Sequence, residues 1–222
     1  NATLGDDTVV FAANGTISLI TPLPLVTNNT SILGPGTNQL TISGNNAVQA
    51  FSFNAGTTNT LSDLTIANAL ATGYTNGAGI ANGGRLTLLN CALVNNTNLG
   101  GWGGGVYNSG NLEVVESAFC GNAVIGENGY IGRSGGGGGA GIGGAICTMS
   151  GNLILKKTRF NGNTASGGNG GNCASVDGGR GGGLNGGYPL GTATGGFGGG
   201  GAGGPYASRS GGDGGFGGGG GG

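Results

Sequence analysis

The sequence predicts an all-β chain wound as a right-handed parallel β-helix, a solenoid in which each turn of the chain stacks on the turn before. Three observations support this prediction: short apolar segments recur every 24–27 residues, apolar and polar residues alternate within them, and no segment has the apolar spacing of an amphipathic helix. Short strands at this interval suit a coil of about three strands per turn, each pairing in parallel with its equivalent one turn later. Right-handed winding follows from the crossover rule for parallel strands.

Three repeats carry the pattern. They comprise segments at 77–82, 86–88 and 93–96, at 103–108, 112–114 and 119–122, and at 143–146, 153–155 and 160–163. An upstream piece at 40–44 has the same pattern as 64–68. The step from Val106 to Ile146 is 40 residues, instead of 26 from Ile80 to Val106, because a glycine-rich insertion at 126–141 lies between them.

Equivalent positions in the repeats predict columns of side chains that run along the solenoid axis, with neighbours roughly 4.8 Å apart. The predicted inward columns are Phe53, Ile80, Val106 and Ile146; Leu61, Leu88, Val114 and Leu155; and Ile66, Leu93, Phe119 and Phe160. A corner ladder of amides, which hydrogen-bond along the axis and tolerate left-handed turns, is predicted from Asn96, Asn122 and Asn163.

The chain divides into two parts. Residues 1–165 form the predicted solenoid, including the insertion at 126–141, and residues 166–222 form a glycine-rich segment. Glycine supplies 61 of the 222 residues, and the second part is too poor in apolar residues to bury a core of its own. Such a segment is either a flexible linker or a layer of extended, polyglycine-II-like strands. We expect the packed layer.

Composition excludes several functions. Histidine is absent, which rules out Ser-His-Asp and Cys-His catalysis and His-ligated metal sites. Charged residues make up 7% of the chain and the net charge is −1, so no basic field exists for nucleic acid. No run of 18 apolar residues predicts a helical membrane span. We therefore expect no catalytic residue, metal or cofactor.

One column offers an enzymatic alternative. Asp63, Asn90, Glu116 and Lys157 occupy equivalent positions. Two carboxylates two turns apart would be separated by roughly 9–10 Å, near the upper limit for an inverting glycosidase pair. No second acidic column or aromatic platform accompanies them. A solvated exterior column, with a modest contact between Glu116 and Lys157, is the favoured interpretation.

A surface rich in Asn, Thr and Gly predicts an extracellular protein, in which any disulfide would be an addition to the fold. The four cysteines, which allow three pairings, are Cys91, Cys120, Cys147 and Cys173. A bond between Cys120 and Cys147 could close the base of the insertion, Cys173 could tie the glycine-rich segment to the coil, and Cys91 has the character of a buried free thiol. Candidate glycosylation sites are Asn1, Asn14, Asn28, Asn29 and Asn95.

Aromatic residues are spread through the glycine-rich stretches. The candidate assembly contacts are Trp102, Tyr188, Phe197, Tyr206 and Phe216. In a filament these rings would anchor neighbouring subunits, and in an adhesin they would contact the ligand.

The paired signatures Gly-Gly-Ala-Ile at 143–146 and Phe-x-x-Asn at 119–122 and 160–163 resemble the repeats of chlamydial polymorphic membrane proteins. Over residues 6–165 the pattern is similar to the bacterial secreted right-handed β-helix surface proteins. That resemblance implies an adhesin or passenger domain outside the cell. The sequence differs from those families in that a glycine-rich segment, instead of another Gly-Gly-Ala-Ile coil, follows residue 165.

The ends of a β-helix are unpaired strand edges, which proteins either cap or use. No charged amphipathic cap helix is predicted. Because another Gly-Gly-Ala-Ile coil would be expected to follow, we expect either that the chain is a piece of a longer one or that its last coil is left open for a partner. Open ends favour head-to-tail contact, which gives a filament when the rotation does not close. We therefore expect a non-enzymatic, self-associating subunit of an extracellular or cell-surface filament. The alternatives are a monomeric adhesin that binds a glycan or host surface, and a polysaccharide-active enzyme.

Overall fold

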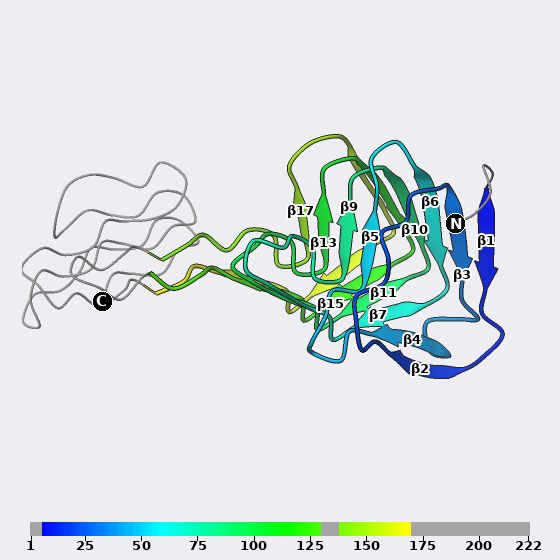
Figure 1. Ribbon diagram of the computed structural model, residues 1–222, viewed down its shortest axis with the longest axis horizontal. Coiled ribbons are helices and arrows are strands. Elements are labelled where there is room, and N and C mark those ends of the chain that lie inside the picture. Colours follow the sequence, from blue (N-terminus) through cyan, green and yellow to red (C-terminus); the bar gives the residue numbers. More distant parts are fainter. Residues whose placement is uncertain (1–5, 130–137, 170–222) are drawn as a thin grey trace, which may run out of the picture.

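The computed structural model describes residues 6–129 and 138–169, and these residues contain no helix. They form a parallel β-solenoid of four full turns built from four sheets, preceded by two partial turns (Figure 1). Sheet A joins β1 (Asp7–Val10), β3 (Thr30–Leu33), β6 (Thr58–Ser62), β10 (Arg85–Leu89), β14 (Asn111–Val115) and β18 (Leu153–Lys156). Sheet B joins β2 (Gly15–Ser18), β4 (Leu40–Ser43), β7 (Thr65–Ala67), β11 (Ala92–Val94), β15 (Ala118–Cys120) and β19 (Arg159–Asn161).

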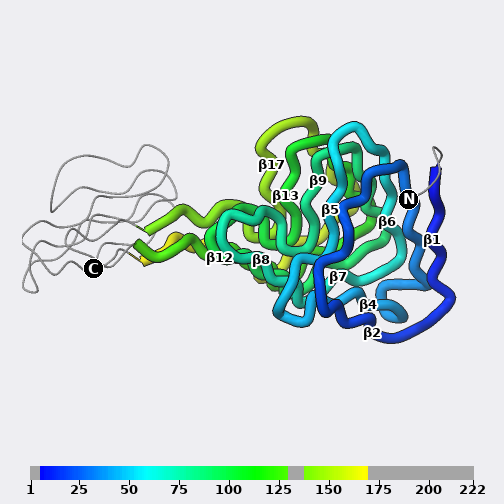
Figure 2. The backbone as a smooth tube through the Cα atoms, viewed as in Figure 1, coloured from blue at the N-terminus to red at the C-terminus, as the bar shows by residue number. Residues whose placement is uncertain are grey.

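Two narrower sheets complete each turn. Sheet C joins β5 (Phe51–Phe53), β9 (Ile80–Asn82), β13 (Val106–Asn108) and β17 (Ile146–Thr148). Sheet D joins β8 (Leu70–Thr72), β12 (Thr97–Leu99), β16 (Ala123–Ile125) and β20 (Thr164–Ser166). Each full turn visits C, A, B and D in order, so it holds four strands instead of the three expected from the sequence. The first two turns hold strands of sheets A and B alone (Figure 2).

The core consists of stacked side chains. Strand register places Leu61, Leu88, Val114 and Leu155 in one column of sheet A. In sheet B it places Ile66, Leu93, Phe119 and Phe160 in one column. Upstream, Val9 and Ile32 extend the first column, and Ile17 and Ile42 extend the second.

The sheet C column differs from its prediction by one member. Ile80, Val106 and Ile146 are in register, but Ile80 pairs with Phe51, and Phe53 lies beside Asn82. Both phenylalanines are buried. The reason for the shift is the corner at 54–57, which is two residues longer than the equivalent corner at 83–84.

Two corners of each turn use left-handed backbone. Between sheets A and B the left-handed residues are Asp63, Asn90, Glu116 and Lys157, with φ of 57°, 48°, 51° and 49°. Between sheets B and D they are Asn68, Asn95, Gly121 and Gly162. Short polar side chains and glycine tolerate this region best. At the corner between sheets B and D the left-handed residue therefore comes one position before each ladder asparagine. The sequence had predicted left-handed backbone at the ladder asparagines themselves.

The amide ladder lies inside the solenoid. Asn96 Nδ2 donates to Asn122 Oδ1 at 2.9 Å, and Asn122 Nδ2 donates to Asn163 Oδ1 at 2.9 Å. A second pair, which sequence reasoning missed, joins Asn82 Nδ2 to Asn108 Oδ1 at 2.7 Å in sheet C. Every buried side-chain nitrogen and oxygen of the described residues has a hydrogen-bond partner, so these polar columns stabilise the core instead of weakening it.

Candidate functional site

The two ends of the solenoid expose the same columns that the interior buries. In the sheet A column, Val9 is 42% exposed and Leu155 44%, while Leu61, Leu88 and Val114 are fully buried. In the sheet B column, Ile17 is 39% exposed and Phe160 47%. Each column thus ends in a half-exposed apolar side chain at both ends of the described solenoid.

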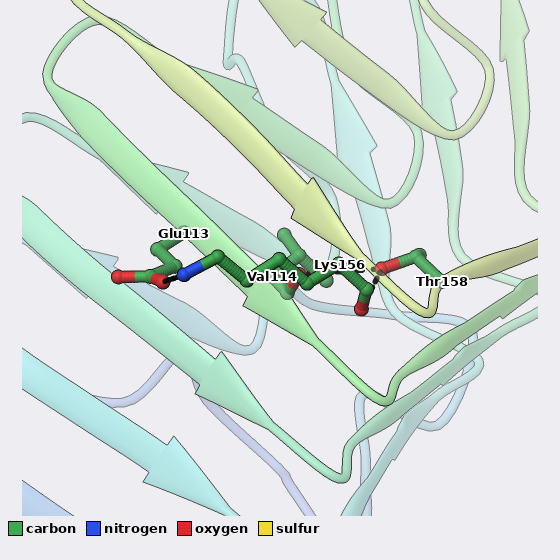
Figure 3. Close-up of polar contacts among 4 residues, drawn as sticks. All are labelled: Glu113, Val114, Lys156 and Thr158. Atoms are coloured by element: carbon green, nitrogen blue, oxygen red, sulfur yellow. Dashed lines mark hydrogen bonds and ion pairs between the residues drawn. The ribbon is translucent and has the colours of Figure 1, made fainter.

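The last turn packs on the turn below it through specific side-chain contacts. The ring of Phe160 stacks on that of Phe119, with centroids 5.2 Å apart. Lys156 Nζ contacts Glu113 Oε1 at 2.7 Å, across the β14–β18 pair, and Thr158 Oγ1 lies 3.3 Å from the carbonyl oxygen of Val114 (Figure 3). The exposed face of this turn is therefore a formed strand edge with apolar and basic side chains.

Charge is segregated along the axis. Between residues 6 and 84, which build the first turns, the charged residues are Asp6, Asp7 and Asp63. Between residues 142 and 169, which build the last turn, they are Lys156, Lys157 and Arg159. One end of the solenoid is therefore acidic and the other basic, although the net charge of the chain is only −1.

A glycine-rich arm leaves the solenoid beside sheet D. It contains three extended segments, 126–129, 138–141 and 166–169, which run together in Figure 2. Gly126 N donates to Ser166 O and Gly129 N to Asn169 O, so the bonded residues are three apart in both segments. The third segment joins through Gly139 N to Glu127 O and Gly168 N to Gly139 O. The three-residue spacing matches the threefold repeat of a polyproline-II-like helix instead of the two-residue repeat of a strand.

The arm depends on glycine for its packing. A Cβ at Gly126, Gly138 or Gly168 would lie about 2 Å from backbone atoms of a neighbouring segment. Residues 166–169 pack against part of the insertion, and the polyglycine-II-like layer expected over 166–222 stays a prediction. Residues 170–222 lie outside the described residues.

The corner column forms one wall of a shallow groove over sheet B. The groove has a volume of about 390 Å³. It is lined by Thr37, Asn90, Cys91, Ala92, Glu116, Ser117, Ala118, Lys157 and Arg159. Along its wall, Asn90 Nδ2 donates to Asp63 Oδ1 at 2.6 Å and Lys157 Nζ contacts Glu116 Oε1 at 2.7 Å. The hydrogen bond to Glu116 raises the pKa of Lys157. Both carboxylates of the enzymatic alternative therefore already have a neighbour as partner.

The three described cysteines are free thiols and form no bond with one another. Cys120 lies in sheet B and Cys147 in sheet C, whereas Cys91 is buried at the corner between sheets A and B. Burial raises the pKa of Cys91 to about 12 and that of Cys147 above its ordinary value. Cys173 lies outside the described residues, so a bond between it and another cysteine stays a prediction.

The remaining predicted sites are dispersed. Asn14, Asn29 and Asn95 are exposed and Asn28 is half-buried, while Asn1 lies outside the described residues. The amide nitrogen of Asn29 donates to Asp6 Oδ1 at 2.9 Å. Trp102 packs near Tyr107, with ring centroids 6.4 Å apart. The other predicted assembly contacts, outside the described residues, are Tyr188, Phe197, Tyr206 and Phe216.

Comparisons with known proteins add no relative. A scan against protein-family models finds no match, and searches of curated proteins and of solved structures find no similar chain. Within the described part of the chain, no cluster of three or more metal-ligating side chains occurs and no helix is long and apolar enough to cross a membrane.

Sequence reasoning missed two features of the ends. Val9 and Ile17 were not assigned to columns, although the alternating segments around them precede Ile32 and Ile42 by 23 and 25 residues, close to the repeat length. The segregation of charge was also overlooked, and it is readable directly from the sequence.

Proposed function

We propose that this chain is a non-enzymatic structural subunit of an extracellular or cell-surface filament, in which copies associate head to tail through the ends of the solenoid. One observation carries the proposal: the sheet A and sheet B columns both end in half-exposed apolar residues at both ends. The proposal includes right-handed winding and secretion from a bacterium, as in the β-helix surface proteins that the repeats resemble.

Burial of apolar side chains at such a junction favours association. The four column ends are Val9, Ile17, Leu155 and Phe160. Full burial of an exposed Val, Leu, Ile or Phe side chain contributes about 1.5–3 kcal/mol, so four half-exposed ones contribute about 3–6 kcal/mol per junction. Backbone hydrogen bonds along the joined strand edges add to this contribution.

Electron microscopy and sedimentation of the full 222-residue chain test the proposal. We expect filaments for the wild type and a shift to monomers for Phe160→Asp, because the substitution places a charge at the end of an apolar column. Leu99→Asp is the matched control: Leu99 is also exposed, but it lies on the outer side of sheet D away from the ends. Monomeric wild-type protein at all concentrations would overturn the proposal.

A monomeric adhesin or passenger-like domain is the second candidate, favoured by the groove over sheet B. Under that function the groove binds a glycan or host-surface ligand, and the chain needs no copy of itself. Binding to a glycan array by monomeric protein, lost on Arg159→Ala while the fold is retained, would favour it. A polysaccharide-active enzyme is the third alternative, and release of sugar fragments that stops with Glu116→Gln is the result that would favour it.

A further inference from the structure

The strands available at the two ends restrict how copies can join. Sheets A and B begin at β1 and β2 and finish at β18 and β19, so each presents a strand edge at both ends of the described solenoid. The strands of sheets C and D begin only at β5 and β8, two turns later, and in the second turn a single residue, Val26, bridges to β5. A second copy can therefore continue two sheets directly, but not all four.

We infer that copies join head to tail with their strands in register, so that β18 pairs with β1 of the next copy and β19 pairs with β2 of the next copy. This inference rests on the proposed head-to-tail assembly and specifies its interface. Continuing each column by one step puts Val9 of the next copy on Leu155 and Ile17 of the next copy on Phe160. Neighbouring strands lie about 4.8 Å apart, so the join extends the existing stacks without a change in spacing.

Charge favours head-to-tail contact over the two contacts between like ends, in which a basic end meets a basic end or an acidic end meets an acidic end. Lys156 and Lys157 are already paired with carboxylates of the turn below, which leaves Arg159 as the cation of the last turn with no ion pair among the described residues. The incoming end carries Asp6 and Asp7. Joining two like ends would oppose charges of the same sign, whereas head-to-tail contact puts the basic end of one copy against the acidic end of the next, an attraction that is strongest at low salt because 0.1 M salt screens charges over about 10 Å.

At the junction, sheets A and B therefore continue from one copy to the next, whereas sheets C and D do not. The edges of β17 and β20 meet no strand of equivalent position, because the first two turns of the next copy contain no strand of sheet C or D. Each subunit boundary is held on the side of sheets A and B, and the filament has a repeating gap on the opposite side.

Disulfide trapping in the full chain tests the register. In the column on the outer face of sheet A, Thr8 is the first residue and Ile154 the last, so the join places Thr8 of one copy beside Ile154 of another. Their Cα atoms would be about 4.8 Å apart, within the range a disulfide spans. The variant carrying Thr8→Cys and Ile154→Cys should give a covalent ladder on a non-reducing gel.

The matched control carries Thr8→Cys and Asn152→Cys, in which the second thiol is two residues away along the strand and about 8 Å from its partner. It should give no ladder, and the single variants measure the background from the native thiols. Filaments with no ladder, or with equal ladders in both variants, would overturn the register and leave the filament function standing. Protein that stays monomeric would overturn both.

Discussion

The amide ladder gives the sharpest test of the interior. Asn122 is fully buried, and its side chain makes four hydrogen bonds. Its Oδ1 accepts from the backbone N and the Nδ2 of Asn96, at 3.1 and 2.9 Å, and its Nδ2 donates to Leu93 O and to Asn163 Oδ1, both at 2.9 Å. Asn122→Ala leaves the buried Asn96 N–H and Leu93 carbonyl without these partners. At about 1–3 kcal/mol for each of the two unsatisfied groups, we expect a loss of about 2–6 kcal/mol in the free energy of unfolding.

Urea denaturation followed by circular dichroism measures this loss. Asn163→Ala is the control, because Asn163 lies at the partly exposed end of the ladder, where water can replace the lost bonds. Its cost should be clearly smaller. A loss below about 1 kcal/mol for Asn122→Ala, or equal losses for the two variants, would refute the view that the ladder is a buried, cooperative column.

Three further predictions concern the corner glycines, the buried thiol and the basic end. Gly162→Ala should lower the free energy of unfolding by about 1 kcal/mol, because its φ of +61° is unfavourable for alanine but the added Cβ has room. Gly168→Ala should remove amide-exchange protection along the arm, because the added Cβ would lie 1.9 Å from the carbonyl oxygen of Glu127. Since burial raises the pKa of Cys91 from 9.0 to about 12, the unfolded chain loses this proton first. The free energy of unfolding should therefore fall above pH 9 by about 1.4 kcal/mol per pH unit, and Cys91→Ser should lack that slope in pH-dependent melts. Arg159→Glu should slow filament elongation roughly tenfold at low salt by light scattering, while Arg85→Glu, in the middle of the solenoid, should not.

Each of these predictions has a contrary outcome. Amide-exchange protection along the arm that survives Gly168→Ala would mean that the arm is not packed. Modification of Cys91 in the native state at neutral pH would show that the thiol is accessible. An elongation rate that is indifferent to salt and to Arg159→Glu would remove charge from the junction.

The sequence predicted sheets A and B well because their inward positions are apolar in every repeat. Leu88 and Leu93 have large apolar equivalents one turn before and one turn after, so spacing alone reveals both columns. Sheet D escaped prediction for the opposite reason. Its inward column is Ala71, Asn98, Val124 and Ala165, which mixes small and polar side chains and has no hydrophobic periodicity.

Variation in the length of the corners limited the prediction of sheet C. Phe51 and Phe53 are both buried. The corner at 54–57 is two residues longer than those at 83–84 and 109–110, so the repeat spacing matched Phe53 to Ile80 although Phe51 is its partner. The packing of the arm could not be predicted, because glycine-rich segments give no pattern that says which of them will pack together. The hydrogen bonds that unite the insertion with residues 166–169 depend on the solenoid bringing β16 and β20 side by side.

Fibre diffraction from oriented assemblies of the full chain tests the central claim most directly. If the columns continue from copy to copy, the strands lie across the filament and their spacing gives a meridional reflection near 4.8 Å. Oriented filaments whose 4.8 Å reflection is absent or equatorial would contradict the stacking of solenoid ends.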